Sequence, residues 1–272
     1  MITVDNKHFS IPQICRSGQC FRLDETGKGI YEVTARDKYL KMEVQAERTI
    51  FHCGEEEYEA FWKQYFDLGT DYGEYLSRID LKDEYLKKAA EFGSGIRILR
   101  QDVWEMVITF ILSQQSNIPR IKRMISALSE RYGEMRETPE GKVYHAFPDA
   151  DSLAGATEEE LRGMKFGYRS RYICGTAQMA SSGQVDLPGL SRMGYPEARA
   201  ELMKLPGVGG KVADCICLFA LHHLDAFPVD THIKKVVDSQ YGGAFPFERY
   251  TGCAGVMQQY IFYYDLKGEA DG

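Results

Sequence analysis

Residues 205–214 read Leu205-Pro206-Gly207-Val208-Gly209-Gly210-Lys211-Val212-Ala213-Asp214. The pattern predicts a short helix that ends near residue 204, a glycine-rich turn, and a second helix that starts at about Lys211. Backbone N–H groups at such a turn and at a helix start can bind an anion without basic side chains. We therefore predict a helix-hairpin-helix phosphate clamp at about residues 197–221. The alternative is a tight helix connection that binds nothing.

Two residues near this turn are candidates for chemistry. Lys211 opens the second helix, where the helix dipole disfavours a cation. Dipole and burial would both favour the neutral, nucleophilic amine, whereas the alternative is an ordinary exposed lysine. Asp230 lies in the run Phe227-Pro228-Val229-Asp230-Thr231-His232. It could simply cap the following helix, but beside a clamped phosphate it becomes a candidate catalytic carboxylate.

The sequence predicts an α+β protein with two parts that divide near residue 93. Residues 1–93 begin with alternating segments typical of an antiparallel sheet and turn helical from about residue 56. The expected strands are residues 30–36, 39–44 and 49–53. Residues 94–272 are expected to form an all-α bundle that contains the hairpin. Its expected helices are residues 103–111, 118–132, 151–164, 168–182, 196–204, 211–221, 231–241 and 252–266.

Composition excludes several classes of protein. The 272 residues are 44% hydrophobic, 27% charged and 12% aromatic, as in a globular protein and unlike a disordered one. The sequence has no run of ~18 apolar residues, so no membrane span is predicted. The seven cysteines are scattered, so we expect free thiols in a reducing cytoplasm. The pair Cys215 and Cys217 lacks zinc-site spacing, and Cys253 alone cannot supply a four-cysteine cluster near the C-terminus.

The net charge of −7 argues at first sight against a nucleic-acid partner. However, residues 1–93 contain 13 Lys and Arg against 18 Asp and Glu, whereas residues 94–272 contain 20 against 22. Basic residues cluster at 117–123 and 161–172, although such clusters are often only solvated surface. One face can therefore bind DNA while the whole chain is acidic.

The motifs together resemble one family. Residues 205–214 and 228–232 are similar to the helix-hairpin-helix base-excision DNA glycosylases. The narrower resemblance is to the 8-oxoguanine DNA glycosylases, and it rests on motifs along nearly the whole chain, at residues 17–22, 99–102, 167–172 and 211–217. It implies a bifunctional glycosylase/AP lyase that flips 8-oxoguanine out of duplex DNA, preferentially opposite cytosine. It also implies a monomer that needs no cofactor.

The resemblance assigns the chemistry and the base pocket. Lys211 would attack C1′ of the sugar and form a Schiff base, and Asp230 would stabilise positive charge on the sugar. The carbonyl of Gly18 would accept the N7–H that guanine lacks. Cys215 and Phe262 would sandwich the flipped base, and Gln258 would bond its Watson–Crick edge. Taken alone, Gly18 could be a turn glycine, and Cys215 and Phe262 could be core residues.

The resemblance also assigns DNA contacts and a cation site. The expected DNA contacts are Gly207 and Gly209 in the hairpin, His232 at a phosphate, Tyr168 as a wedge, Arg120 and Arg169 at the unpaired cytosine, and Gln115 in the gap left by the flipped base. The hairpin carbonyls of Met203, Leu205 and Val208 are expected to hold a monovalent cation.

The sequence departs from the family at two positions. Gln115 replaces a commoner asparagine, and Gly210 replaces a commoner polar residue, which should loosen the turn.

Two other functions remain open. An alkylpurine glycosylase would share the hairpin, but Lys211 favours a lyase over an enzyme that uses activated water. A DNA-binding module without catalysis would not need Lys211 and Asp230 together.

Overall fold

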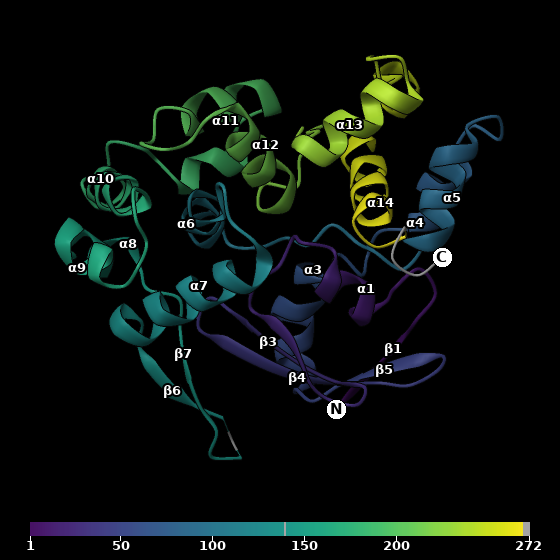
Figure 1. Ribbon diagram of the computed structural model, residues 1–272. Helices are drawn as coiled ribbons and strands as arrows, with labels where there is room; N and C mark the ends of the chain where they lie inside the picture. Colours follow the sequence, from purple (N-terminus) through teal and green to yellow (C-terminus); the bar gives the residue numbers. More distant parts are fainter. Residues whose placement is uncertain (139, 269–272) are drawn as a thin grey trace.

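The computed structural model describes residues 1–138 and 140–268. It confirms an α+β fold in which an antiparallel sheet lies beneath a larger group of helices (Figure 1). The five strands are β1 (Ile2–Asp5), β2 (Leu23–Gly27), β3 (Ile30–Ala35), β4 (Lys38–Val44) and β5 (Arg48–Phe51). Their order across the sheet is β1-β5-β4-β3-β2.

Alternation along the strands explains the sheet. In β3, Tyr31, Val33 and Ala35 are buried, and the residues between them are partly exposed. The three predicted strands are confirmed, whereas β1 and β2 were missed. Only Leu23 of β2 is buried, so this edge strand has no hydrophobic alternation, and its last residues look like a turn.

One face of the sheet carries a small aromatic core. The helices that pack on this face are α1 (Ile11–Arg16), α2 (Glu55–Glu57), the π-helix η1 (Tyr58–Trp62) and α3 (Lys63–Tyr65). Phe66 meets Phe51 edge-on at 5.4 Å between ring centroids, and Trp62 is fully buried beside them. These rings bury much of the apolar area of a small lobe.

The remaining helices form the second core. They are α4 (Tyr72–Ser77), α5 (Glu84–Phe92), α6 (Val103–Ser113), α7 (Ile118–Tyr132), α8 (Ala150–Ala154), α9 (Glu158–Gly163), α10 (Arg169–Ser181), α11 (Tyr195–Leu202), α12 (Gly210–Phe219), α13 (Thr231–Gln240) and α14 (Ala254–Lys267). Short 3-10 helices span η2 (Pro188–Arg192) and η3 (Phe247–Tyr250). The predicted helix over residues 118–132 has the bounds of α7.

Two predictions for this part were wrong. Residues 151–164 form two helices, because Thr157 caps a new helix in a reciprocal capping box with Glu160. The part is also not all-α, since β6 (Met135–Glu137) and β7 (Val143–His145) form a two-stranded ribbon. Each strand has only three residues, too few to show a periodic pattern.

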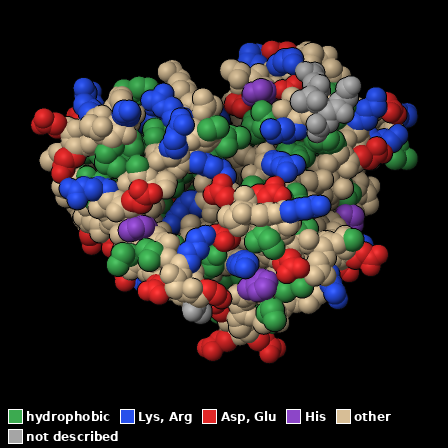
Figure 2. Space-filling model, turned by 60° about the horizontal axis from the view of Figure 1, so that its bottom comes forward, with side chains coloured by type: hydrophobic (Ala, Val, Ile, Leu, Met, Phe, Trp, Pro, Cys, Tyr) green, Lys and Arg blue, Asp and Glu red, His purple; other side chains and the backbone are tan. Residues whose placement is uncertain are grey.

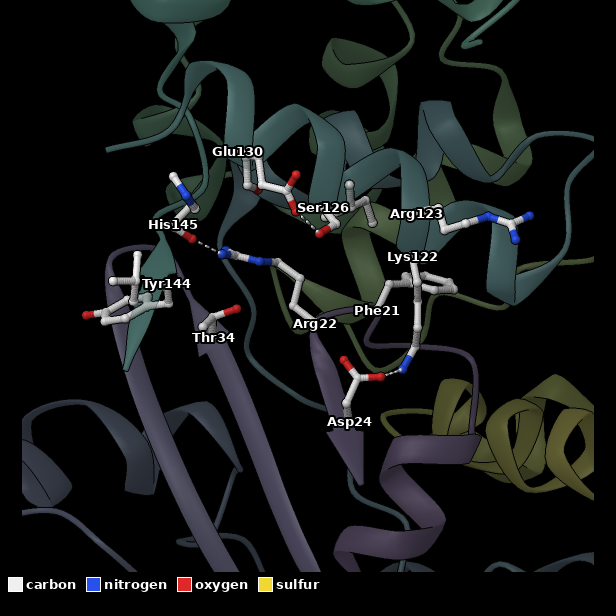
Figure 3. Close-up of a pocket in the computed structure, with 13 residues that line it drawn as sticks. Phe21, Arg22, Asp24, Thr34, Lys122, Arg123, Ser126, Glu130, Tyr144 and His145 are labelled. Atoms are coloured by element: carbon white, nitrogen blue, oxygen red, sulfur yellow. Dashed lines mark hydrogen bonds and ion pairs between the residues drawn. The ribbon is translucent and has the colours of Figure 1, made fainter. Parts of the chain in front are cut away.

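The ribbon and α7 fasten the helices to the sheet. Arg22 forms a buried ion pair with Glu105 of α6 at 3.4 Å and donates to the carbonyl of His145 at 2.6 Å. Lys122 of α7 pairs with Asp24 at 2.6 Å. These contacts border a cavity between α7, β7 and the sheet (Figure 3). Seen from below, Lys and Arg side chains lie next to Asp and Glu around the hollowed middle of the surface (Figure 2).

The segment between α5 and α6 is buried along much of its length. The side chain of Gln19 bonds its backbone at two points, from Nε2 to the carbonyl of Arg97 at 3.0 Å and from the N–H of Leu99 to Oε1 at 2.9 Å. The side chain of Arg97 in turn donates to the carbonyls of His8, Asp67 and Thr70. The predicted division at residue 93 thus falls just before a segment that packs on the first lobe.

Within the described residues, no helix is long and apolar enough to cross a membrane. All seven cysteines are free thiols.

Candidate active site

A pocket opens where five segments meet. It is lined by Gly18, Phe110, Lys211, Cys215, Phe219, Pro228, Asp230, Gln258, Gln259 and Phe262. The lining comes from the turn after α1, from α6 and α12, from the loop before α13, and from α14. All six residues that the sequence predicted for chemistry and for the base pocket therefore lie together. Their individual roles stay predictions.

Lys211 stands in the first turn of α12, where the helix start is open. The N-cap is Gly209, which has no side chain to cap the first N–H groups, and the first turn has no acidic residue. The Nζ atom of Lys211 lies 5.7 Å from the centroid of the Phe110 ring. Lys211 is nevertheless exposed, so the expectation that the protein buries this amine was wrong.

Asp230 both caps a helix and borders the pocket. It is the N-cap of α13, and its carboxylate accepts the N–H of Ile233 at 2.9 Å. The two interpretations of this residue are thus compatible. Because the cap fixes the side chain at the end of the loop, one oxygen is held by the helix while the residue lines the pocket beside Lys211.

Cys215 lies one helical turn after Lys211 and is buried. Burial raises the pKa of the Cys215 thiol to about 11, and the nearby Lys211 opposes this rise. The group is therefore a neutral thiol at physiological pH. It presents a polarisable, uncharged surface to the pocket.

Two neighbouring amides of α14 are buried and line the pocket. Gln258 donates from Nε2 to the carbonyl of Pro228 at 3.1 Å, and its Oε1 has no partner among the residues that the structure describes. Gln259 donates to the carbonyl of Ser17 at 2.6 Å and so holds the turn that carries Gly18. Gln259 was missed by the sequence analysis. The signal was two successive glutamines in the otherwise apolar first part of the helix, residues 254–263.

His232 pairs with a residue that the sequence analysis also missed. Its Nδ1 lies 2.7 Å from Oδ2 of Asp265 on α14, and its ring meets Phe262 edge-on at 5.9 Å. The imidazole is 43% exposed, which leaves it accessible to a ligand. Because Asp265 is 33 residues away, no local pattern reveals this pair.

The hairpin itself is tightly packed. Gly207 has φ +79°, and a β-carbon there would lie 2.5 Å from Cγ of Tyr172. At Gly210, a β-carbon would lie 2.5 Å from Nη2 of Arg199. Arg199 donates to Asp214 at 2.6 Å and so braces α11 against α12. Gly210 therefore leaves room for a guanidinium, and the expected loosening of the turn is offset by this ion pair.

The other predicted DNA contacts lie at the junction of α6, α7 and α10. Tyr168 is 43% exposed, and Gln115 is exposed with φ +46°. Arg120, in the first turn of α7, is partly exposed. Arg169 differs from expectation, because it is only 2% exposed and its guanidinium donates to the carbonyls of Gln114 and Gln115. It could read a base only after leaving these carbonyls.

The predicted cation site lies in the turn between α11 and α12. The carbonyl of Leu205 accepts the N–H of Val208 at 3.1 Å, and Met203 is the C-cap of α11. Across residues 1–138 and 140–268, no group of three or more His, Cys, Asp or Glu side chains could hold a metal ion.

Known proteins share this architecture. Residues 108–243 match the HhH-GPD superfamily of base excision DNA repair proteins, so the chain belongs to this class. Residues 1–107 match the N-terminal domain of 8-oxoguanine DNA glycosylase. Within the class, the chain therefore belongs to the 8-oxoguanine DNA glycosylase family.

Individual relatives agree with this placement. The N-glycosylase/DNA lyase of Arabidopsis thaliana is 32% identical over 86% of this chain and 67% of its own length. The N-glycosylase/DNA lyase of Saccharomyces cerevisiae is 39% identical over 54% of this chain, and the match spans only 42% of the yeast protein. The Clostridium acetobutylicum 8-oxoguanine glycosylase/lyase, in complex with DNA that has cytosine opposite 8-oxoguanine, has a TM-score of 0.91. It is 37% identical and covers 98% of this chain and 94% of its own.

Proposed function

We propose that the protein is a bifunctional DNA glycosylase/AP lyase that excises 8-oxoguanine from duplex DNA, preferentially opposite cytosine. The observation that carries the proposal is the pocket in which Lys211, Asp230 and Gly18 meet at the start of α12. A lysine at an uncapped helix start beside a half-buried carboxylate suits covalent attack on a sugar next to a bound phosphate. The family and its relatives support the same activity.

The base would be removed by substitution at the sugar. The neutral amine of Lys211 attacks C1′ and forms a C–N bond as the bond from C1′ to the base breaks. The departing base takes the bonding electron pair and then a proton. The carboxylate of Asp230 stabilises the positive charge that develops on the sugar. Lys211 is exposed in the structure, so its amine is accessible to a flipped nucleotide.

Strand cleavage would follow from the same covalent bond. Opening of the sugar ring converts the adduct into a Schiff base between Lys211 and C1′. Loss of a proton from C2′ then expels the 3′ oxygen with its phosphate, which nicks the strand 3′ of the lesion. Water finally hydrolyses the Schiff base and frees the amine. No step needs a redox cofactor.

Recognition of the base would use both ends of the pocket. The carbonyl of Gly18 accepts the N7–H of 8-oxoguanine, whereas guanine presents an unprotonated N7 there. Gln258 has an Oε1 that lacks a partner in the described part of the chain. This oxygen suits the N–H donors on the Watson–Crick edge of a guanine derivative. The ring of Phe262 and the thiol of Cys215 enclose the two faces of the base.

DNA contacts would be divided between backbone and side chains. The N–H groups at Gly207 and Gly209 bind phosphate, and His232 binds a neighbouring one. Tyr168 wedges into the stack, Gln115 fills the gap, and Arg120 with Arg169 reads the cytosine. The carbonyls of Met203, Leu205 and Val208 hold a monovalent cation. We further propose that the protein is a monomer in the cytoplasm, and the free thiols support the reducing compartment.

Borohydride trapping tests the proposal. The protein is incubated with duplexes that carry 8-oxoguanine opposite cytosine, 8-oxoguanine opposite adenine, or an alkylated purine, and borohydride then reduces any Schiff base. We expect a covalent adduct with 8-oxoguanine, formed faster opposite cytosine. Lys211→Gln should give no adduct yet still bind the lesion. The control is Lys204→Gln, which removes a lysine that pairs with Glu201 near the same hairpin. Absence of an adduct with every duplex would refute the lyase.

A further inference from the structure

Gln114 joins segments that are far apart in the sequence. It is the C-cap residue of α6, and its Nε2 donates to the carbonyl of Gly207 in the hairpin at 2.9 Å. Its own carbonyl accepts from the guanidinium of Arg169 and from the hydroxyl of Tyr168, the latter at 3.4 Å. One residue thus contacts both the hairpin, which would bind the lesion strand, and the corner that would face the opposite strand.

The contact with the hairpin exceeds what a helix cap requires. The same Nε2 also donates to the carbonyl of Ile111 at 3.2 Å, which satisfies a C-terminal carbonyl of α6. The second bond, to Gly207, spans 93 residues of sequence. The amide nitrogen carries two N–H groups, so it can donate to both carbonyls at once. The side chain therefore has a fixed orientation and links α6 to the hairpin turn.

Arg169 carries a buried positive charge without a carboxylate. It is 2% exposed, and within residues 1–138 and 140–268 its guanidinium bonds only backbone carbonyls, those of Gln114, Gln115 and Phe166. Its Nε has no partner in that part of the chain. Burial lowers the pKa of the guanidinium, and the nearby Arg120 adds to this effect. The guanidinium also lies over the ring of Tyr168, with Cζ 4.7 Å from the ring centroid. A buried cation held by carbonyl dipoles and an aromatic face, without a carboxylate, is costly, so acceptors on a ligand would relieve it.

Gln115 is held in a backbone conformation that favours glycine. Its φ of +46° lies in the left-handed region, and its carbonyl is one of the acceptors of Arg169. Such strain persists only where surrounding contacts impose it. Departure of Arg169 would therefore remove one contact that imposes the present conformation of Gln115.

We propose that Gln114 is a positioning residue that couples phosphate binding at the hairpin to the reading of the opposite base by Arg169. The inference rests on the proposed function. Without DNA, Arg169 occupies the carbonyls of the loop at residues 114–115. When Arg169 turns toward an unpaired base, the bond from Gln114 to Gly207 keeps this loop in register with the hairpin. Arg169 and Gln115 are thereby placed at a set distance from the clamped lesion strand.

A double-mutant cycle tests this role. The ratio of kcat/KM for 8-oxoguanine opposite cytosine to that opposite adenine is measured for the wild type, Gln114→Ala, Arg169→Ala and the double variant. We expect Gln114→Ala to lower the ratio roughly tenfold, within the usual range of coupling between sites. Because Gln114 would act through Arg169, the double variant should have the ratio of Arg169→Ala alone. A merely structural loss would slow both substrates alike.

The matched control is Ser113→Ala, one residue earlier at the same helix end. Among the residues that the structure describes, the Ser113 hydroxyl donates only to the carbonyl of Phe110, at 2.8 Å, and makes no bond to the hairpin. This variant should keep the wild-type ratio. Gln114→Glu gives a second version of the test, because an ionised carboxylate of the same shape cannot donate to Gly207. Melting temperatures establish that each variant is folded.

Two results would overturn the inference. One is a wild-type ratio in both Gln114 variants, and the other is a double variant in which the two single effects simply multiply. Either result leaves the proposed function intact, provided that the wild type prefers cytosine. A wild-type enzyme without opposite-base preference would instead refute that part of the proposed function, together with the inference built on it.

Discussion

Gly18 lies so close to Phe262 that a β-carbon on residue 18 would be 3.0 Å from Cε1 of the ring. The backbone of Gly18 also has φ +75°, where a side chain is disfavoured. Two separate constraints thus require glycine at the edge of the base pocket. One concerns the turn, and the other leaves space for the ring of Phe262, which we propose lies over a bound base.

Gly18→Ala should therefore impair excision more than stability. We expect a loss of about 1–2 kcal/mol in unfolding free energy from the left-handed conformation. Excision of 8-oxoguanine should fall further, because the ring of Phe262 must move. The control is Gly183→Ala, since Gly183 has a similar φ of +71° but no atom near its missing β-carbon. Equal excision by the two variants, measured in single turnover, would contradict this account.

Substitutions at Asp230 should separate capping from catalysis. Asparagine caps helices as well as aspartate does, so Asp230→Asn should keep the bond to Ile233 and the melting temperature. Base removal should nevertheless slow by about 10²-fold or more, because the amide cannot stabilise a developing cation. Asp230→Ala should lose the same activity and also about 1 kcal/mol of stability. Normal excision by Asp230→Asn would exclude the carboxylate from the chemistry.

Arg120→Ala should relax the preference for the opposite base. A good contact from an arginine to a base edge contributes about 1–3 kcal/mol of discrimination. We expect excision opposite cytosine to approach that opposite adenine, as judged from single-turnover rates on the two duplexes. Arg123→Ala is the control for losing a positive charge on α7, and it should weaken binding to both duplexes alike. An unchanged preference in Arg120→Ala would disprove the role.

The raised pKa values of two buried thiols predict that the folded protein loses stability at high pH. Burial raises the pKa of Cys20 and of Cys215 to about 11, from an ordinary value near 9. The folded protein then retains both protons while the unfolded chain loses them. Stability from these thiols is thus complete below pH 9 and falls as the pH rises through 11.

Each thiol can contribute up to about 3 kcal/mol to this loss. Denaturant unfolding between pH 8 and pH 11 would measure it. Cys215→Ala should show a shallower decline above pH 9 than the wild type. Identical slopes would mean that Cys215 ionises equally in both states. Native Cys20 and Cys215 should also react slowly with thiol reagents at pH 8.

The two candidate catalytic residues could be predicted from the sequence because they sit at local signals. Lys211 follows a glycine-rich turn and Asp230 begins a helix, and both patterns are readable over a few residues. The long helices α6 and α7 were predicted for the same reason, since their apolar periodicity persists over three or four turns. Gly18, Gln258 and Phe262 were located only through resemblance to a family.

What the sequence could not reveal depends on long-range contacts. Nothing near Arg169 indicates that its guanidinium is buried against carbonyls more than 50 residues away. The exposure of Lys211 likewise depends on how α6 and α14 surround α12. The ribbon of β6 and β7 was missed because its strands are held by partners in the first lobe, as in the bond from Tyr144 to the carbonyl of Asp37.

The buried segment after α5 limits where this protein can be divided into separately expressed fragments. A fragment that stops at residue 93 would leave the amide of Gln19 without its backbone partners and would lack Leu99, which belongs to the core of the sheet. The complementary fragment would carry Leu99 without the core that covers it. Because α4 and α5 belong to the core of the helices, neither fragment can keep its core intact, and the two lobes should melt in one cooperative transition.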